Sequence, residues 1–117
     1  MTIREAQADL RQFLDERGWF PTDTEERYYT MLHAMEELGE LARVITHLES
    51  RRAKIQAQRN DVVLQHEDLI LELGDVFCHV LKLAEAYGVS TEESFQRTMA
   101  KNRAKYPLDK FKDLNLE

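Results

Sequence analysis

The fold is decided by the stretch LILELGDVFCHVLKLA, residues 69–84. At about 100° per residue, its apolar side chains cover most of a helical circumference, which is typical of a buried helix. The polar side chains share an arc of roughly 80°; they are Asp68, Glu72, Asp75, His79 and Lys82. Because an unpaired buried charge is too costly to keep, we expect this stripe to face something positive.

A second acidic stretch, MEELGEL at residues 35–41, is the natural companion of this helix. Its spacing puts Glu36, Glu37 and Glu40 on one helical face. If both helices direct carboxylates inward, they form an all-oxygen pocket, and such ligands suit Mg²⁺, Mn²⁺ or Ca²⁺ rather than zinc or copper. Acids at this spacing are also common on solvated helix faces, which is the alternative interpretation. Glu72 and Asp75 are the stronger evidence, because their helix has no other hydrophilic side.

Length and charge limit the class of protein. A chain of 117 residues predicts one domain, residues 1–117, and its few glycines and prolines favour long helices. A net charge of −6 gives no support for general nucleic-acid binding. No run approaches the ~18 apolar residues of a membrane span, and the charged segment 1–13 does not resemble a signal peptide. We therefore expect a cytoplasmic protein without a membrane or nucleic-acid partner.

Helix signals divide the chain into four helices. Capping boxes begin at Thr2, Thr22 and Ser90, while Gly18 and Gly88 fit positions just beyond helix ends. The third helix should begin between residues 62 and 67, and the fourth should stop before residue 107, which is a proline.

Several side chains need an interpretation of their own. Trp19 either fills space between helices or forms a flat wall for a base. Cys78 is expected to be a small core residue. The inner side of the last helix should carry Phe95, Met99 and Ala100. The basic run at residues 49–59 favours a solvated helix end over a phosphate site, and residues 108–117 either fold back or fray.

Taken together, these motifs resemble a known family. EELGEL at residues 36–41, followed by ELGD at 72–75, looks like the EExxE…ExxD signature of the MazG-like, all-α nucleoside triphosphate pyrophosphohydrolases. The segment KNRAKYP, residues 101–107, resembles the phosphate-contacting carboxy-terminal segment of that family. The resemblance covers residues 10 to 107, nearly the whole chain.

The resemblance implies a four-helix bundle-type protomer that assembles into homodimers or homotetramers, with sites near the subunit interface. It implies Mg²⁺-dependent hydrolysis of (deoxy)nucleoside triphosphates to the monophosphate and pyrophosphate, with Mn²⁺ as a second possible cofactor. The residues that match the metal ligands are Glu37, Glu40, Glu72 and Asp75, and Glu36 matches an acid that contacts metal or orients the attacking water. The residues that match substrate contacts are Trp19 near the base and Lys101, Asn102, Arg103, Lys105 and Tyr106 at the triphosphate.

One feature departs from the family pattern. Thirty-one residues separate Glu40 from Glu72, more than is usual, and the excess lies around residues 51–63. It predicts extra turns on the two central helices or a longer loop. The leading function is removal of particular nucleotides from the pool; the alternatives are hydrolysis of phosphoribosyl-ATP and a non-catalytic oligomerisation or regulatory module.

Overall fold

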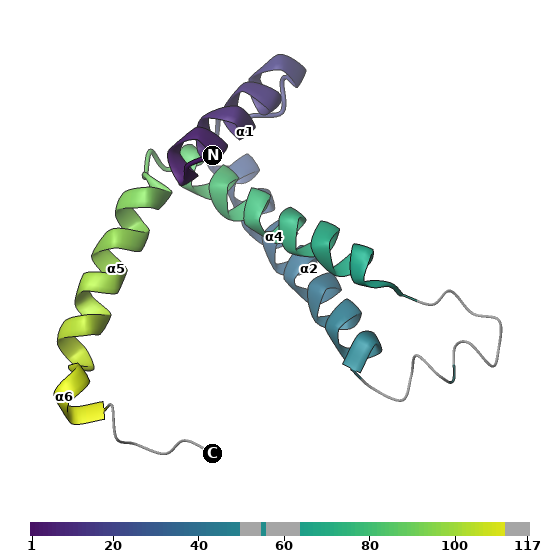
Figure 1. Cartoon of the computed structure of the whole chain (residues 1–117). Coiled ribbons are helices and arrows are strands. Elements are labelled where there is room, and N and C mark those ends of the chain that lie inside the picture. The colour runs from purple at the N-terminus through teal and green to yellow at the C-terminus, as the bar shows by residue number, and fades with distance from the viewer. Residues whose placement is uncertain (50–54, 56–63, 112–117) are drawn as a thin grey trace.

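The computed structural model describes residues 1–49, 55 and 64–111, and the predictions for the basic run, the excess spacing and the end of the tail lie largely outside them. Within the described residues the regular structure is entirely helical (Figure 1). The helices are α1 (Ile3–Arg17), α2 (Thr24–Glu49), α4 (His66–Ala86), α5 (Thr91–Lys105) and the short α6 (Leu108–Phe111). The all-α class is confirmed.

Three of the helix-end signals act as the sequence predicts. The Thr2 hydroxyl accepts a hydrogen bond from the Glu5 N–H at 3.0 Å, which caps α1. Gly18 ends α1 in the left-handed conformation with φ 68°, where a residue without a Cβ is favoured. The Ser90 hydroxyl caps α5 in the same way as Thr2, by accepting from the Glu93 N–H at 3.2 Å.

The start of α2 corrects the predicted capping box by one residue. The sequence pattern placed the cap at Thr22, but α2 begins at Thr24 and Asp23 is its cap, accepting from the Glu26 N–H at 2.8 Å. The Glu26 carboxylate reaches back to the Thr22 N–H at 2.7 Å. An aspartate is at least as good a cap as a threonine, and Glu26 satisfies a further backbone donor, so this register is the better one.

The central unit of the structure is the antiparallel pair of α2 and α4, which run side by side (Figure 1). α1 packs on α4, and α5 contacts α1 and leads away from the α2–α4 pair (Figure 1). Few apolar side chains of the described residues are buried; those that lie on the helices are Leu14, Leu41, Val44 and Leu81. The buried apolar side chains therefore form no single core: Leu14 and Leu81 belong to the end of the helix pair on which α1 packs, whereas Leu41 and Val44 lie in the second half of α2.

Gln7 fixes the junction of three helices. Its Nε2 donates to Glu85 Oε1 of α4 and to the Val89 carbonyl, each at 2.9 Å. Its Oε1 accepts from the Thr91 N–H at 2.9 Å and from the Thr91 hydroxyl at the start of α5. The amide thus uses both donors and both acceptor positions while being buried, and it holds the turn from which α5 departs.

The burial of α4 corrects the expectation that it is covered all round. One face carries large apolar side chains that are 45–59 % exposed; they are Ile70, Leu71, Leu73, Phe77 and Val80. Cys78 is also exposed rather than part of the core. α5 has no buried residue, so Phe95 and Ala100 are exposed and Met99 is half-buried. The reason is geometric: α1 contacts α4 towards its C-terminal end, where Leu81 is buried, and α5 leads away, so the N-terminal part of this face has no covering helix among the described residues.

In the described part of the chain, no helix combines the length and the apolar character that a membrane-crossing segment needs.

We expect Gln7→Leu to destabilise the fold by about 1–3 kcal/mol, because it leaves partly buried donors and acceptors of Glu85, Val89 and Thr91 without partners. Gln12→Leu is the matched control, since Gln12 is on the same helix and makes one exposed bond to Glu16; its effect should stay within about 0.5 kcal/mol. Urea unfolding measures both. Equal stability of the two variants would contradict the role of Gln7.

Candidate metal centre

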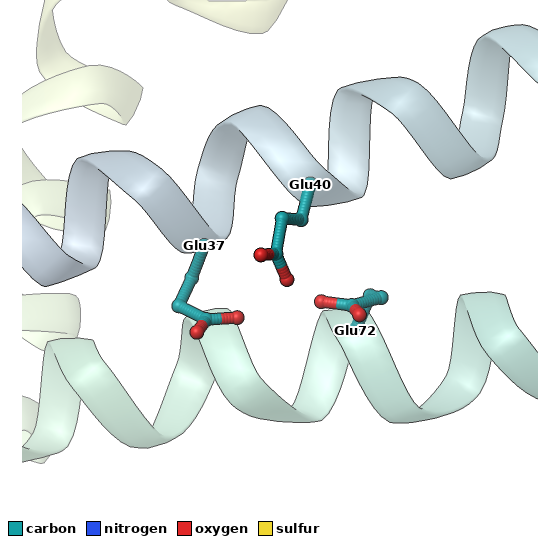
Figure 2. Close-up of side chains that lie close together, drawn as sticks. All are labelled: Glu37, Glu40 and Glu72. Carbon is teal, nitrogen blue, oxygen red and sulfur yellow. The ribbon is translucent and has the colours of Figure 1, made fainter.

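Three carboxylates from two helices converge between α2 and α4. Glu37 and Glu40 lie one turn apart on α2, and Glu72 faces them from α4 (Figure 2). One oxygen of each lies within 4.8 Å of the corresponding oxygens of the other two. The i,i+3 spacing on α2 and the antiparallel packing of α4 are enough to produce this geometry. The structure therefore brings together three of the four predicted metal ligands.

The environment of these carboxylates favours a cation. Glu37 Oε2 and Glu72 Oε2 are buried and have no hydrogen-bond partner within the described residues. Buried acceptors are normally satisfied, and an unsatisfied carboxylate oxygen is especially costly. Glu40 is exposed, so the cluster is open on that side. Several carboxylate oxygens with one accessible side fit a hard divalent cation that keeps some of its waters.

Burial and electrostatic repulsion both act on the pKa of Glu72. Partial burial raises the pKa of its carboxyl group above the ordinary 4.5, and the negative charges of Glu40, Glu37 and Asp75 raise the pKa further. The charged form that a metal needs is therefore the form that the protein alone disfavours. A divalent cation would reverse this balance by supplying the missing positive charge.

The other predicted acids lie beside the cluster. Asp75 does not belong to the group of three and is exposed, but its charge acts on Glu72, which places it nearby. Glu36 is exposed and lies outside the group of three. His79 Nδ1 is 2.8 Å from the Asp75 carbonyl oxygen. Because a carbonyl can only accept, this ring nitrogen carries the proton, and Nε2 remains the available acceptor in the neutral ring.

The predicted phosphate contacts are not brought to the acids of the same chain. Lys101, Arg103 and Lys105 are exposed on α5, and Asn102 is half-buried. α5 leads away from the α2–α4 pair (Figure 1). Tyr106 packs edge-on against Phe111 of α6, with ring centroids 5.5 Å apart. Within one chain, the acidic and basic halves of the predicted site are separate.

Trp19 lies on a cavity of about 240 Å³ between the α1–α2 connector, α2 and α4. The indole is 60 % exposed and contacts Phe13 edge-to-face at 6.0 Å, so it does not fill space between the helices of one chain. The other residues lining the cavity include Phe20, Tyr29, Thr30, His33 and Lys82. This position argues against a space-filling role for Trp19, and its role as a wall for a base stays a prediction.

The sequence interpretation missed Tyr29 and Thr30 as part of this cavity. The spacing carries a signal that can be used only once the register of α2 against α4 is known: Thr30 precedes Glu37 by seven residues, and Lys82 follows Asp75 by seven. Seven residues are two helical turns, or about 10 Å. In an antiparallel pair these positions face each other, so the cavity and the carboxylates lie on one line along α2 and α4.

Comparison with known proteins identifies the protein family to which this chain belongs. The family model described as "MazG nucleotide pyrophosphohydrolase domain" matches residues 25–108. The chain belongs to this family, which confirms the resemblance seen in the motifs, and a divalent metal is the cofactor typical of the family. The match covers α2, α4 and α5, and so it includes both the carboxylates and the basic residues.

Two relatives from Bacillus subtilis (strain 168) are similar over most of their length. The chain is 34% identical to "Uncharacterized protein YvdC" over 94 residues, which are 80% of this chain and 85% of the relative. It is 32% identical to "Uncharacterized protein YpjD" over 104 residues, which are 86% of this chain and 82% of the relative. No solved structure matches significantly.

The raised pKa of Glu72 predicts a pH-dependent stability of the metal-free protein. The folded state holds its proton more tightly than the unfolded state, so this stabilisation is full below the ordinary value of 4.5 and is lost as the pH rises through the raised pKa. Glu72→Gln removes the titration. Its Tm advantage over the wild type should be small at acidic pH and should grow as the pH rises.

Thermal unfolding in a chelator between pH 4 and pH 8 tests this, with the exposed Glu67→Gln on the same helix as control. A Tm difference between wild type and Glu72→Gln that does not change with pH would contradict the electrostatic account of the cluster.

Proposed function

We propose that this protein hydrolyses a nucleoside triphosphate to the monophosphate and pyrophosphate, with Mg²⁺ or Mn²⁺ held by Glu37, Glu40, Glu72 and Asp75. The observation that carries the proposal is the convergence of Glu37, Glu40 and Glu72, two of whose carboxylate oxygens are buried with no hydrogen-bond partner among the residues that the structure describes. Membership of a nucleotide pyrophosphohydrolase family supports the reaction type. Removal of particular nucleotides from the pool is the role that we propose for it.

In the proposed reaction, the cation would supply positive charge and the residues of the chain hold and orient the reacting groups. A bound Mg²⁺ would neutralise the phosphate oxygens and make a coordinated water more acidic. The chain holds the carboxylates in one place: α2 presents Glu37 and Glu40, and α4 presents Glu72. The proposed role of Glu36, which is exposed next to Glu37, is to orient the attacking water.

The nucleoside is proposed to extend along the helix pair from the carboxylates to the cavity beside Trp19. The separation of about 10 Å along α2 suits a sugar and base attached to a phosphate at the carboxylates. The Trp19 and Tyr29 rings offer flat surfaces for stacking on a base. This arrangement uses the cavity and the acids as one continuous site.

The triphosphate contacts are proposed to come from a second copy of the chain. The basic α5 leads away from its own acids, so Lys101, Arg103 and Lys105 can complete a site only on another protomer. An association between two copies is also supported by the exposed apolar face of α4, which consists of Ile70, Leu71, Leu73, Phe77 and Val80. Contiguous exposed apolar surface commonly marks an interface, and a homodimer or homotetramer would bury it.

Pyrophosphate release from a panel of nucleotides with Mg²⁺ tests the proposed reaction, and phosphoribosyl-ATP belongs in the panel. We expect turnover of at least one triphosphate, and a loss of at least about a hundredfold in Glu40→Gln and Asp75→Asn, because they remove proposed ligands. Circular dichroism should show unchanged helicity, and Glu67→Gln should keep full activity. Release of orthophosphate, turnover of phosphoribosyl-ATP alone, or unchanged turnover in both variants would contradict the proposal.

Mixing two inactive variants tests the shared site. Glu40→Gln damages the acids and Arg103→Ala damages the basic segment, so a mixed dimer has one site with both halves intact. After mixing by reversible dissociation, random pairing should restore roughly a quarter of the wild-type activity. Mixing Glu40→Gln with Asp75→Asn is the control and should restore nothing, because both changes fall on the same half. No recovery in the first mixture would contradict a site shared between copies.

A further inference from the structure

The cavity beside Trp19 contains a hydrogen-bond donor, Lys82, that has no role in the proposed reaction. Lys82 lines it from α4 and is half-buried. Among the described residues, Lys82 forms no ion pair with a carboxylate. A lysine ammonium carries three donors and no acceptor, so the cavity contains a cation that can bind an acceptor on a ligand.

The neighbouring polar groups add an acceptor beside this donor. Thr30 lines the same cavity from α2 and is 3 % exposed. Its hydroxyl donates to the Glu26 carbonyl at 2.9 Å, so the oxygen of Thr30 can only accept from a ligand. The Glu26 carboxylate is exposed at the rim and already accepts from the Thr22 N–H at 2.7 Å. Lys82 and Thr30 therefore offer a donor and an acceptor to a ligand from the two helices that line the cavity.

We propose that Lys82 makes this site selective for keto bases, an inference that rests on the proposed function. Uracil, thymine, guanine and hypoxanthine each present a carbonyl oxygen next to a ring N–H, whereas cytosine and adenine present an amino group next to a ring acceptor. Lys82 donates to the carbonyl oxygen, and Thr30 accepts from the ring N–H. With cytosine or adenine, the amino group would place a donor against the donor Lys82, and the ring nitrogen would place an acceptor against the acceptor Thr30.

The position of Lys82 favours the base over the phosphates. Lys82 follows Asp75 by seven residues and Glu72 by ten, which correspond to about 10 and 15 Å along α4. It shares the cavity with the aromatic rings of Trp19 and Tyr29 instead of lying among the carboxylates. A phosphate held at the acids lies at the other end of the proposed site.

The test uses Trp19 as a reporter, since it is the only tryptophan of the chain and lines the cavity. Fluorescence titrations compare matched monophosphates, IMP with AMP and UMP with CMP, on the wild-type protein. We expect the keto member of each pair to bind at least about tenfold more tightly. Lys82→Met should remove most of this ratio, and Lys82→Arg should keep it because a donor is retained. Lys110→Met, on the exposed α6, is the control and should bind like the wild type.

Equal binding of the two members of each pair, or no fluorescence response to any of them, would overturn the proposal. So would a Lys82→Met protein that keeps the ratio, or one that binds all four nucleotides more weakly by the same factor, which would indicate a phosphate contact. The proposed function is tested separately by pyrophosphate release. Turnover without base preference overturns only the role of Lys82, whereas selective binding without turnover overturns only the reaction.

Discussion

The main constraint on this structure is the repulsion between the carboxylates of Glu37, Glu40 and Glu72, which meet where α2 and α4 pack together. Two antiparallel helices could have met through apolar side chains alone, as they do around Leu41 and Val44. Instead, one turn of each helix directs carboxylates into the seam, and two of their oxygens are buried without a partner in the described part of the chain. Such an arrangement lowers stability unless a cation is present, so it is best explained as a site that the fold maintains for a ligand.

The open shape of the single chain follows from the direction in which α5 leaves the α2–α4 pair. Gln7 uses every hydrogen-bonding position of its amide to hold the turn from which α5 departs. Because α5 leaves in this direction, its basic residues lie away from the carboxylates of the same chain (Figure 1). The apolar face of α4 is left exposed for the same reason. Assembly of two copies is one proposal that accounts for both features.

The sequence predicted what depends on short-range spacing. Caps at Thr2 and Ser90, the stop at Gly18 and the meeting of Glu37, Glu40 and Glu72 follow from local chemistry and helical periodicity. The exposure of Cys78 could not be predicted in this way. Periodicity shows that a helix has apolar sides, but it does not show whether the same chain supplies the covering element.

The cavity was missed for a related reason. Its walls come from three segments: the connector with Trp19, α2 with Tyr29 and Thr30, and α4 with Lys82. No single motif contains them. The facing positions become visible only once the register of α2 against α4 is known, because each lies two turns beyond a carboxylate. The outer parts of a site that spans several elements depend on packing, whereas its acidic centre depends on spacing within each helix.

The central claim is that a divalent cation reconciles the carboxylates of Glu37, Glu40 and Glu72. Electron paramagnetic resonance of Mn²⁺ titrated into the protein measures it directly, because bound Mn²⁺ loses the sharp signal of the free ion. The account predicts binding to the wild type, competition by Mg²⁺, and a loss of binding in Glu72→Gln but not in Glu67→Gln. Equal Mn²⁺ binding by the wild type and Glu72→Gln would contradict it.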